Sequence, residues 1–135
     1  MMSDEVKPFS KVAVLYGGSS SEREISLITG KAVFDSLQLR GVNAILIDTI
    51  EPFIEVLKTE RVTHAWIALH GSDGEDGKIQ SILSMLNIKY TGSDPITCSV
   101  TMNKYFTKSI LQSNGFKTPE YMVVSSSSKY EDIVN

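Results

Sequence analysis

Glu22 and His70 each follow an apolar stretch and stand near glycines, and together they could bind a small polar molecule. A carboxylate is a charged hydrogen-bond acceptor, whereas an imidazole can donate or accept a hydrogen bond. Gly17 and Gly18 precede Glu22, and Gly71 follows His70. Because glycine has no side chain, the backbone at these positions can come close to a ligand. This pattern is typical of a polar small-molecule site.

Buried parallel strands are expected to position these residues. The apolar runs over about 11–16 and 65–69 do not alternate with polar residues, which is typical of strands covered on both faces. A helix is expected over about 22–39, after the glycine turn. Since the carboxyl ends of parallel strands lie at one edge of a sheet, Glu22 and His70 are expected to face a common crevice.

The helix expected over 22–39 carries its polar residues unequally. On a helical wheel, one narrow side gathers Glu24, Lys31, Asp35 and Gln38. Glu22 lies nearly opposite that side, which indicates that its carboxylate has a partner. Ser21 and Glu24 have the spacing of a capping box, in which each side chain satisfies a free backbone amide.

These polar residues also have simpler interpretations. Glu24 is better explained as a helix cap, and Asp73 and Asp76 as solvated loop acids, than as catalytic groups. For Glu22 and His70 the functional and the structural interpretations are nearly balanced.

Further strands and helices alternate along the chain. Strands are expected over about 43–48 and 88–91, and helices over about 52–58 and 79–86. The resulting β-α-β-α-β-α-β order predicts an α/β fold built on a parallel sheet with right-handed crossovers.

A domain boundary is expected near residues 97–100. After it, a helix over 101–114 is expected to end at Gly115 in a left-handed cap. A strand is expected over 121–124.

The two ends of the chain have weak patterns. Residues 1–10 are polar and are expected to form a loose leader. Ser128 and Glu131 repeat the capping-box spacing just before the last residue, as a truncated chain would.

Composition argues against several classes of function. The 13 basic and 16 acidic residues of the 135 are scattered, which gives no footprint for a nucleic acid or a membrane surface. No apolar run has the length of a membrane span, and no signal peptide is recognisable, so we expect a cytoplasmic protein. Cys98 is the single cysteine, and His64 and His70 do not have the spacing of a zinc pair.

Two common nucleotide motifs are incomplete or missing. The turn over 17–21 is not G-x-G-x-x-G, and no G-x-x-x-x-G-K-[ST] is present. Asp48 could imitate a ribose-binding acid but is better explained as a strand-end or turn residue. Lys104 and Lys108 share a helix face, which is usually solvated surface.

Two long motifs stand where strands are expected to end: Gly17-Gly18-Ser19-Ser20-Ser21-Glu22-Arg23-Glu24-Ile25-Ser26 and His70-Gly71-Ser72-Asp73-Gly74-Glu75-Asp76-Gly77-Lys78-Ile79-Gln80-Ser81. With residues 90–93, they resemble the amino-terminal part of bacterial D-alanine–D-alanine ligases, a family of the ATP-grasp superfamily. Met102-Asn103-Lys104 is similar to the Met-Asp-Lys entry to that family's central domain, although Asn103 replaces the aspartate. The resemblance extends over residues 11–124.

The resemblance implies a fold for each part of the chain. Residues 11–100 would form an open parallel Rossmann-like (pre-ATP-grasp) sheet with helices on both faces. Residues 101–135 would hold the first helix and strand of a truncated ATP-grasp central domain.

The resemblance also implies an activity. The family joins two D-alanines to D-alanyl-D-alanine for peptidoglycan synthesis, with hydrolysis of ATP to ADP and phosphate. By matching position, Glu22 would be catalytic and hold the ammonium of the first D-alanine, and His70 would orient that substrate. Gly17, Gly18 and Gly71 would let the backbone approach it, while Glu75 and Asp76 would shape the loop and cap the next helix.

Cofactors and partners follow from the same resemblance. The complete enzyme would use ATP with magnesium or manganese, and Lys104 matches a lysine near the ATP phosphates. The metal ligands of the family are not expected in this chain, which we therefore expect to be inactive alone. D-alanine and ATP are the expected partners, with homodimerisation through the amino-terminal domain and without nucleic acid or membrane.

Two other classes of function stay open. One is a non-catalytic α/β binding or dimerisation module. The other is a Rossmann-type nucleotide-binding domain, which the incomplete glycine fingerprint disfavours.

Overall fold

The structure is a computed structural model that describes residues 11–129. The chain divides into two compact units, residues 1–99 and 100–135. The expected leader over 1–10, and Glu131 of the second expected capping box, lie outside the described residues. No helix in the described part of the chain is long and apolar enough to cross a membrane.

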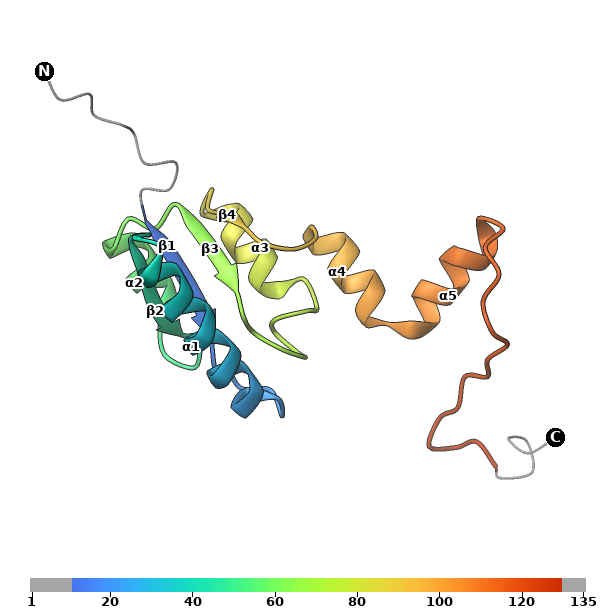
Figure 1. Ribbon diagram of the computed structural model, residues 1–135. Coiled ribbons are helices and arrows are strands. Elements are labelled where there is room, and N and C mark those ends of the chain that lie inside the picture. Colours follow the sequence, from blue (N-terminus) through green and yellow to red (C-terminus); the bar gives the residue numbers. More distant parts are fainter. Residues whose placement is uncertain (1–10, 130–135) are drawn as a thin grey trace, which may run out of the picture. The chain divides into compact units, whose positions relative to one another are not determined.

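The first unit is built on a parallel sheet, as the alternation of strands and helices predicts. Among residues 11–99 the strands are β1 (Val12–Tyr16), β2 (Ala44–Asp48), β3 (His64–Ile67) and β4 (Lys89–Tyr90). Their order is β2-β1-β3-β4 (Figure 1), so β1 pairs with a neighbour on each side. The first four residues of β1 are buried, which explains the absence of alternation in this run.

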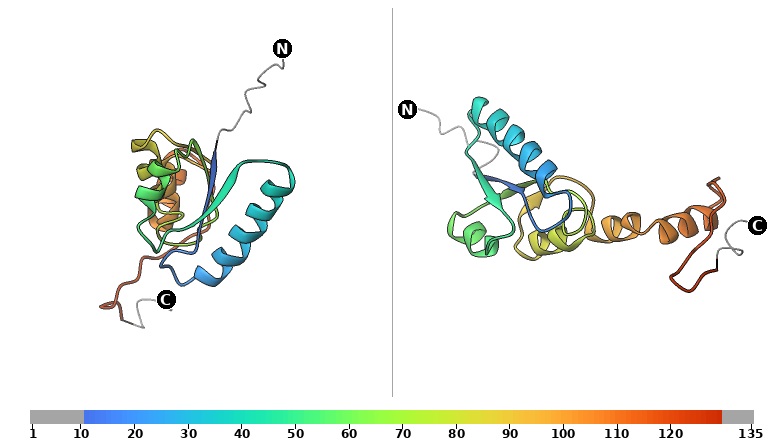
Figure 2. Two further views of the ribbon diagram at one scale, coloured as in Figure 1. Left: turned by 90° about the vertical axis from the view of Figure 1, so that its left-hand side faces the viewer. Right: turned by 90° about the horizontal axis from the view of Figure 1, so that it is seen from below.

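Helices cover both faces of the sheet. α1 (Arg23–Leu39) lies on one side, and α2 (Phe53–Thr59) and α3 (Lys78–Met85) lie on the other (Figure 2). The main core lies between the sheet and the helix pair α2 and α3. Its buried side chains are Ala13, Leu15, Ile47, Leu57, Val62, Ala65, Leu69, Ile79, Leu83 and Ile88.

α1 packs on the sheet through small residues. Ser26 and Gly30 are its buried positions, and a Cβ at Gly30 would lie 2.4 Å from Cβ of Tyr16. Large apolar residues of the same helix stay exposed, Ile25 at 54% and Ile28 at 67%. The apolar surface of α1 is therefore wider than the surface that it buries.

The second part of the chain differs from the expectation of one helix over 101–114. Two helices are present, α4 (Pro95–Met102) and α5 (Lys104–Ser113). The helix is interrupted between them because Asn103 has an extended backbone and its side chain accepts hydrogen bonds from the amides of Tyr105 and Phe106. The left-handed cap at Gly115 is confirmed, with φ of +80°.

Two further differences have local causes. The start of α4 was not predicted, although the Asp94 carboxylate caps it by accepting the amides of Ile96 and Thr97. The strand expected over 121–124 is not formed. Within residues 100–129 no neighbouring strand provides the ladder of hydrogen bonds that a strand needs.

Candidate functional site

Hydrogen bonds that its two glycine amides donate fix the conformation of the turn after β1. The Gly17 amide donates to Ser26 Oγ at 2.9 Å, and the Gly18 amide donates to Asp48 Oδ1 at 3.2 Å. Both glycines have positive φ, and a Cβ at Gly17 would lie 2.3 Å from Asp48 Oδ1. Glycine therefore suits this position, because any other residue would strain the backbone and displace the Asp48 carboxylate.

Arg23 and Asp48 form a two-pronged ion pair beside this turn. Arg23 Nη1 and Nη2 lie 3.0 and 2.6 Å from the two carboxylate oxygens of Asp48, and Nη1 also donates to the Gly18 carbonyl. The guanidinium lowers the pKa of Asp48 to about 2, against the opposing effect of burial. Asp48 is thus a structural partner of the turn, and its oxygens are already engaged.

The pairing of Arg23 with Asp48 was not predicted from the sequence. Asp48 stands opposite Tyr16 in the parallel register of β1 and β2, so it emerges at the same edge as the glycine turn. The order of the strands in the sheet was the missing information.

The predicted capping box at the start of α1 is not formed. The helix begins one residue before Glu24, with Glu22 in the cap position and without a side-chain cap. The hydroxyl of Ser20 instead accepts the Glu22 amide at 3.1 Å and donates to the His70 carbonyl at 2.8 Å. Ser20 therefore connects the first loop to the second. Glu24, the other residue of the predicted capping box, is exposed in the first turn of the helix.

Glu22 and Gly71 meet where the two loops come together. Glu22 is exposed, and a Cβ at Gly71 would lie only 2.6 Å from its Oε2. Gly71 also has a positive φ, of +67°. The carboxylate therefore stands directly over a stretch of backbone that has no side chain.

His70 is half-buried and contacts α1. Its Nε2 lies 3.0 Å from Oγ1 of Thr29. Thr29 comes seven residues after Glu22, two helical turns along, so both belong to one face of α1. His70 was predicted as a site residue and Thr29 was not, although the helical spacing of Thr29 from Glu22 could have indicated it.

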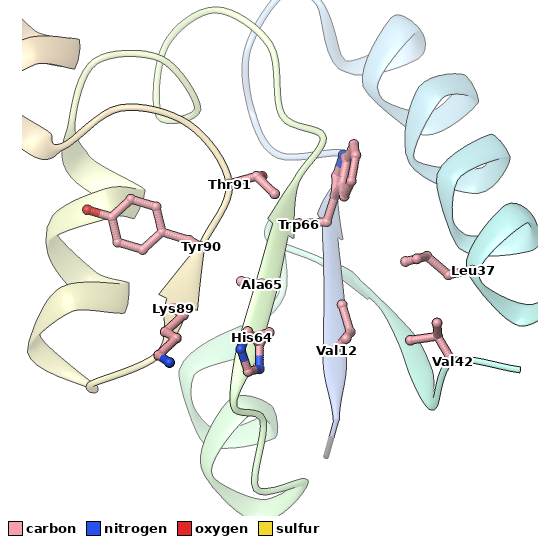
Figure 3. A pocket seen from close by; sticks show the side chains of 9 residues that line it. All are labelled: Val12, Leu37, Val42, His64, Ala65, Trp66, Lys89, Tyr90 and Thr91. Atoms are coloured by element: carbon pink, nitrogen blue, oxygen red, sulfur yellow. The ribbon is translucent and has the colours of Figure 1, made fainter. Parts of the chain in front are cut away.

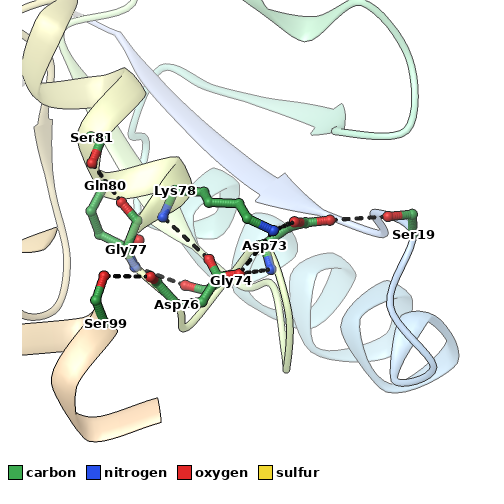
Figure 4. Close-up of polar contacts among 9 residues, drawn as sticks. All are labelled: Ser19, Asp73, Gly74, Asp76, Gly77, Lys78, Gln80, Ser81 and Ser99. Atoms are coloured by element: carbon green, nitrogen blue, oxygen red, sulfur yellow. Dashed lines mark hydrogen bonds and ion pairs between the residues drawn. The ribbon is translucent and has the colours of Figure 1, made fainter. Parts of the chain in front are cut away.

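The loop after β3 is cross-linked by an ion-pair network (Figure 4). Lys78 Nζ lies 2.7 Å from Asp73 and 3.1 Å from Asp76, and Asp73 accepts the hydroxyl of Ser19 at 3.0 Å. The Lys78 ammonium lowers the pKa of Asp73. Asp73 thus joins the two loops, which corrects its interpretation as a solvated acid.

Asp76 shapes this loop and the start of α3, as the resemblance implied, which corrects its interpretation as a solvated acid; Glu75, of which the same role was expected, is exposed. Its carboxylate accepts the amides of Asp73 and Lys78 at 3.1 and 3.2 Å. Burial raises the pKa of Asp76, but hydrogen bonds from the Asp73 amide and from Lys78 outweigh it, so that the pKa is lowered overall. Gln80 is buried behind the loop and donates to the Gly74 carbonyl at 2.7 Å.

Two hollows lie near the sheet. A small one of about 160 Å³ includes Gly18, Ser19, Asp73 and Lys78 in its lining, beside the paired loops. A larger one of about 420 Å³ has a mainly apolar surface, and Figure 3 shows the side chains that line it. Its lining residues are Val12, Leu37, Val42, His64, Ala65, Trp66, Lys89, Tyr90 and Thr91, none of which was predicted to be a site residue.

Lys104 belongs to the second unit, where it is the first residue of α5 and is exposed. Its neighbour Lys108 is engaged, donating to Thr118 Oγ1 and to the Pro119 carbonyl. Within the described residues no group of three or more His, Cys, Asp and Glu side chains is placed to hold a metal ion.

Comparisons with known proteins agree on one family. A family model described as "D-ala D-ala ligase N-terminus" matches residues 50–93. D-alanine–D-alanine ligase B of Pseudomonas putida is 45% identical over 92% of this chain, and the corresponding ligase of Pelotomaculum thermopropionicum is 49% identical over 84%. The chain spans 39% and 36% of these two relatives.

Solved structures give the same result. The crystal structure of D-alanine–D-alanine ligase from Bacillus anthracis complexed with ATP matches with a TM-score of 0.78 and 30% identity, over 91% of this chain and 43% of that one. The ligase of Aeromonas hydrophila matches with a TM-score of 0.74 over 89% of this chain and 52% of that one. At 24% identity, this second match supports the fold alone.

Proposed function

Because this chain belongs to the D-alanine–D-alanine ligase family, whose amino-terminal portion it matches, we propose that it binds the first D-alanine of such a ligase. The full-length enzyme would join two D-alanines to D-alanyl-D-alanine for peptidoglycan synthesis, with hydrolysis of ATP to ADP and phosphate. The observation that carries the proposal is the exposed Glu22 carboxylate standing over the bare backbone of Gly71, next to His70.

Glu22 would hold the ammonium of the substrate. A carboxylate at a loop junction gives an ammonium a charge-assisted acceptor, and the missing side chain at Gly71 leaves room beside it. Ser20 supports this arrangement because it hydrogen-bonds both the Glu22 amide and the His70 carbonyl. Glu22 and the loop that carries His70 would therefore keep a fixed separation while a ligand binds.

The two glycines after β1 would contribute in a different way. Gly17 and Gly18 are buried, and their amides donate to Ser26 and Asp48. They would set the path of the loop that carries Glu22, with the ion pair of Arg23 and Asp48 holding that path. Their proposed role is to position the carboxylate, and it replaces the expectation that their backbone approaches the substrate.

ATP would supply the phosphoryl group that activates the D-alanine carboxylate, and magnesium or manganese would accompany it. Lys104, an exposed ammonium at the start of α5, fits a contact with phosphate oxygens. The described residues offer no group of three or more His, Cys, Asp and Glu side chains that could hold this metal ion. Its ligands would come from the remaining length of a complete ligase.

A second candidate role is homodimerisation through this domain. The apolar hollow beside α1 and the exposed Ile25 and Ile28 favour association with another surface. This role would add to substrate binding and does not compete with it.

Titration of the chain with D-alanine, followed by amide NMR spectra, tests the proposed function. We expect shifts at the amides around Glu22 and Gly71, and a roughly ten- to hundredfold weaker affinity in Glu22→Gln. Glu24→Gln is the matched control, because Glu24 is an exposed carboxylate of the same helical turn. Equal affinities in the two variants, or no shifts at either loop, would contradict the assignment.

A further inference from the structure

The hydrogen bonds around Thr29 limit where the proton of His70 can be. Thr29 Oγ1 lies 3.0 Å from His70 Nε2, 3.0 Å from the Ile25 carbonyl oxygen and 3.3 Å from the Ser26 carbonyl oxygen. A threonine hydroxyl has one hydrogen and two lone pairs, and a neutral imidazole has one N–H and one bare nitrogen. The single hydroxyl hydrogen cannot serve both the helix carbonyls and the imidazole ring.

The helix carbonyls are the natural acceptors of that hydrogen. Threonine in a helix commonly donates to the carbonyl three or four residues earlier, and Thr29 has both Ile25 and Ser26 within reach. A carbonyl accepts only, so each close oxygen contact there requires the hydroxyl to donate. The Thr29 oxygen then faces His70 as an acceptor.

We infer that Thr29 is a positioning residue that keeps the proton of neutral His70 on Nε2 and leaves Nδ1 bare. Nδ1 has no hydrogen-bond partner among residues 11–129. The Ser20 hydroxyl fixes the same residue from the other side through the His70 carbonyl. The Thr29 hydroxyl of α1 therefore selects the tautomer of the imidazole, while the Ser20 hydroxyl of the first loop fixes the backbone of the same residue.

The tautomer decides what His70 can recognise. A bare Nδ1 accepts a hydrogen bond, so neutral His70 is suited to a donor such as an ammonium and unsuited to a carboxylate. This step rests on the proposed function, in which the ammonium of D-alanine lies at Glu22. The two acceptors, the carboxylate and the imidazole, would then recognise the same end of the substrate.

NMR of the 135-residue chain with ¹⁵N-labelled histidine tests the inference directly. Long-range ¹H–¹⁵N spectra distinguish a protonated ring nitrogen from a bare one, and a His64→Gln variant assigns the signals because the chain has only two histidines. The spectra are recorded at a pH at which the ¹⁵N shifts of the same sample show neutral histidine rings. Thr29→Val removes the hydroxyl while keeping the shape, and Thr29→Ser keeps the hydroxyl.

We expect the Nε2–H form of His70 in the wild-type chain and in Thr29→Ser, with slow exchange of that proton with water. In Thr29→Val the ratio of the Nε2–H to the Nδ1–H form falls roughly two- to tenfold, and the proton exchanges faster. An Nδ1–H ring in the wild-type chain overturns the inference even if the valine variant does not fold. Identical ratios and exchange rates in the wild-type and valine chains also overturn it.

The measurement needs no ligand. A chain that shows the expected tautomer but does not bind D-alanine would contradict the proposed function alone. A chain that binds D-alanine with an Nδ1–H ring would contradict the role of Thr29 alone.

Discussion

At the scale of single residues, the carboxylate of Asp48 organises the first loop. It accepts hydrogen bonds from the Gly18 and Ile50 amides and from both ends of the Arg23 guanidinium. These four donors all favour the charged carboxylate, which explains the low pKa of Asp48, about 2. The loop that presents Glu22 therefore depends on a charge that lies on another strand.

Asp48 is expected to give a stability that depends on pH. Its pKa in the folded chain, about 2, lies below the ordinary value of 3.8, so its contribution is complete above pH 4 and is lost as the pH falls towards 2. Asp48→Asn should therefore be less stable than the wild-type chain at pH 7, and the difference should shrink at pH values of about 2 to 3. Urea unfolding, followed by the fluorescence of Trp66, measures both free energies. Asp35→Asn, on an exposed pair with Lys31, is the control and should change little.

Alanine variants at Gly71 and Gly41 distinguish two effects of an added Cβ: a collision with the Glu22 carboxylate and strain in the backbone. Both have positive φ, +67° and +71°, but a Cβ at Gly41 meets nothing within 4 Å. Each alanine variant should lose about 1–2 kcal/mol of unfolding free energy from the left-handed backbone. Only Gly71→Ala should also weaken D-alanine binding, because it displaces the Glu22 carboxylate. Calorimetric titration of both variants measures this, and equal affinities would contradict the placement of Glu22 in the site.

At the scale of elements, α1 is joined to two strands through one hydroxyl. Ser26 is fully buried, accepts the Gly17 amide at 2.9 Å and donates to the Ala68 carbonyl at 2.7 Å. The amide follows β1 and the carbonyl follows β3, so a single side chain fixes the helix against the carboxyl edge of the sheet. Sequence periodicity predicted the extent of α1 within one residue. It did not predict a role for Ser26, which stood out only as part of a family motif.

Removing that hydroxyl should cost stability. Ser26→Ala leaves a buried amide and a buried carbonyl without partners, and we expect a loss of about 2 kcal/mol of unfolding free energy. Ser36→Ala on the exposed side of the same helix is the matched control and should stay within about 0.5 kcal/mol of the wild-type chain. Urea unfolding of the three chains provides the comparison. Equal stabilities would mean that α1 docks without this bond.

At the scale of the whole molecule, the chain divides into two units, the second of which begins near residue 100. It spans 39% of the Pseudomonas putida ligase to which it is similar. The paired loops with Glu22 and His70 belong entirely to the first unit. Under the proposed function, the binding of D-alanine would therefore belong to the first unit.

The isolated 135-residue chain should not hydrolyse ATP in response to D-alanine. The reason is that metal-binding residues of the family are expected in the length of the relatives that this chain does not span. A coupled assay for ADP release with purified chain, with and without D-alanine, tests this expectation. A complete ligase assayed under the same conditions is the positive control. Turnover that depends on D-alanine and persists through purification would refute it.

The sequence by itself determined the local features of this protein. Unbroken apolar runs gave the buried parallel strands, helical spacing gave α1 and α3 within a residue or two, and Gly115 marked the end of α5. These features depend on neighbours a few residues away, which the sequence shows directly. The family motifs likewise stand in continuous segments, so the resemblance could be recognised without coordinates.

Only the tertiary structure decided which side chains meet. The pairs Arg23 with Asp48, Ser20 with His70, and Thr29 with His70 join residues that lie 25 to 50 positions apart. Such contacts depend on strand order and on the rotation of α1 against the sheet, and neither is encoded in local periodicity. The capping box predicted at Ser21 did not form: Glu22 occupies the cap position of α1, and its amide donates to the hydroxyl of Ser20.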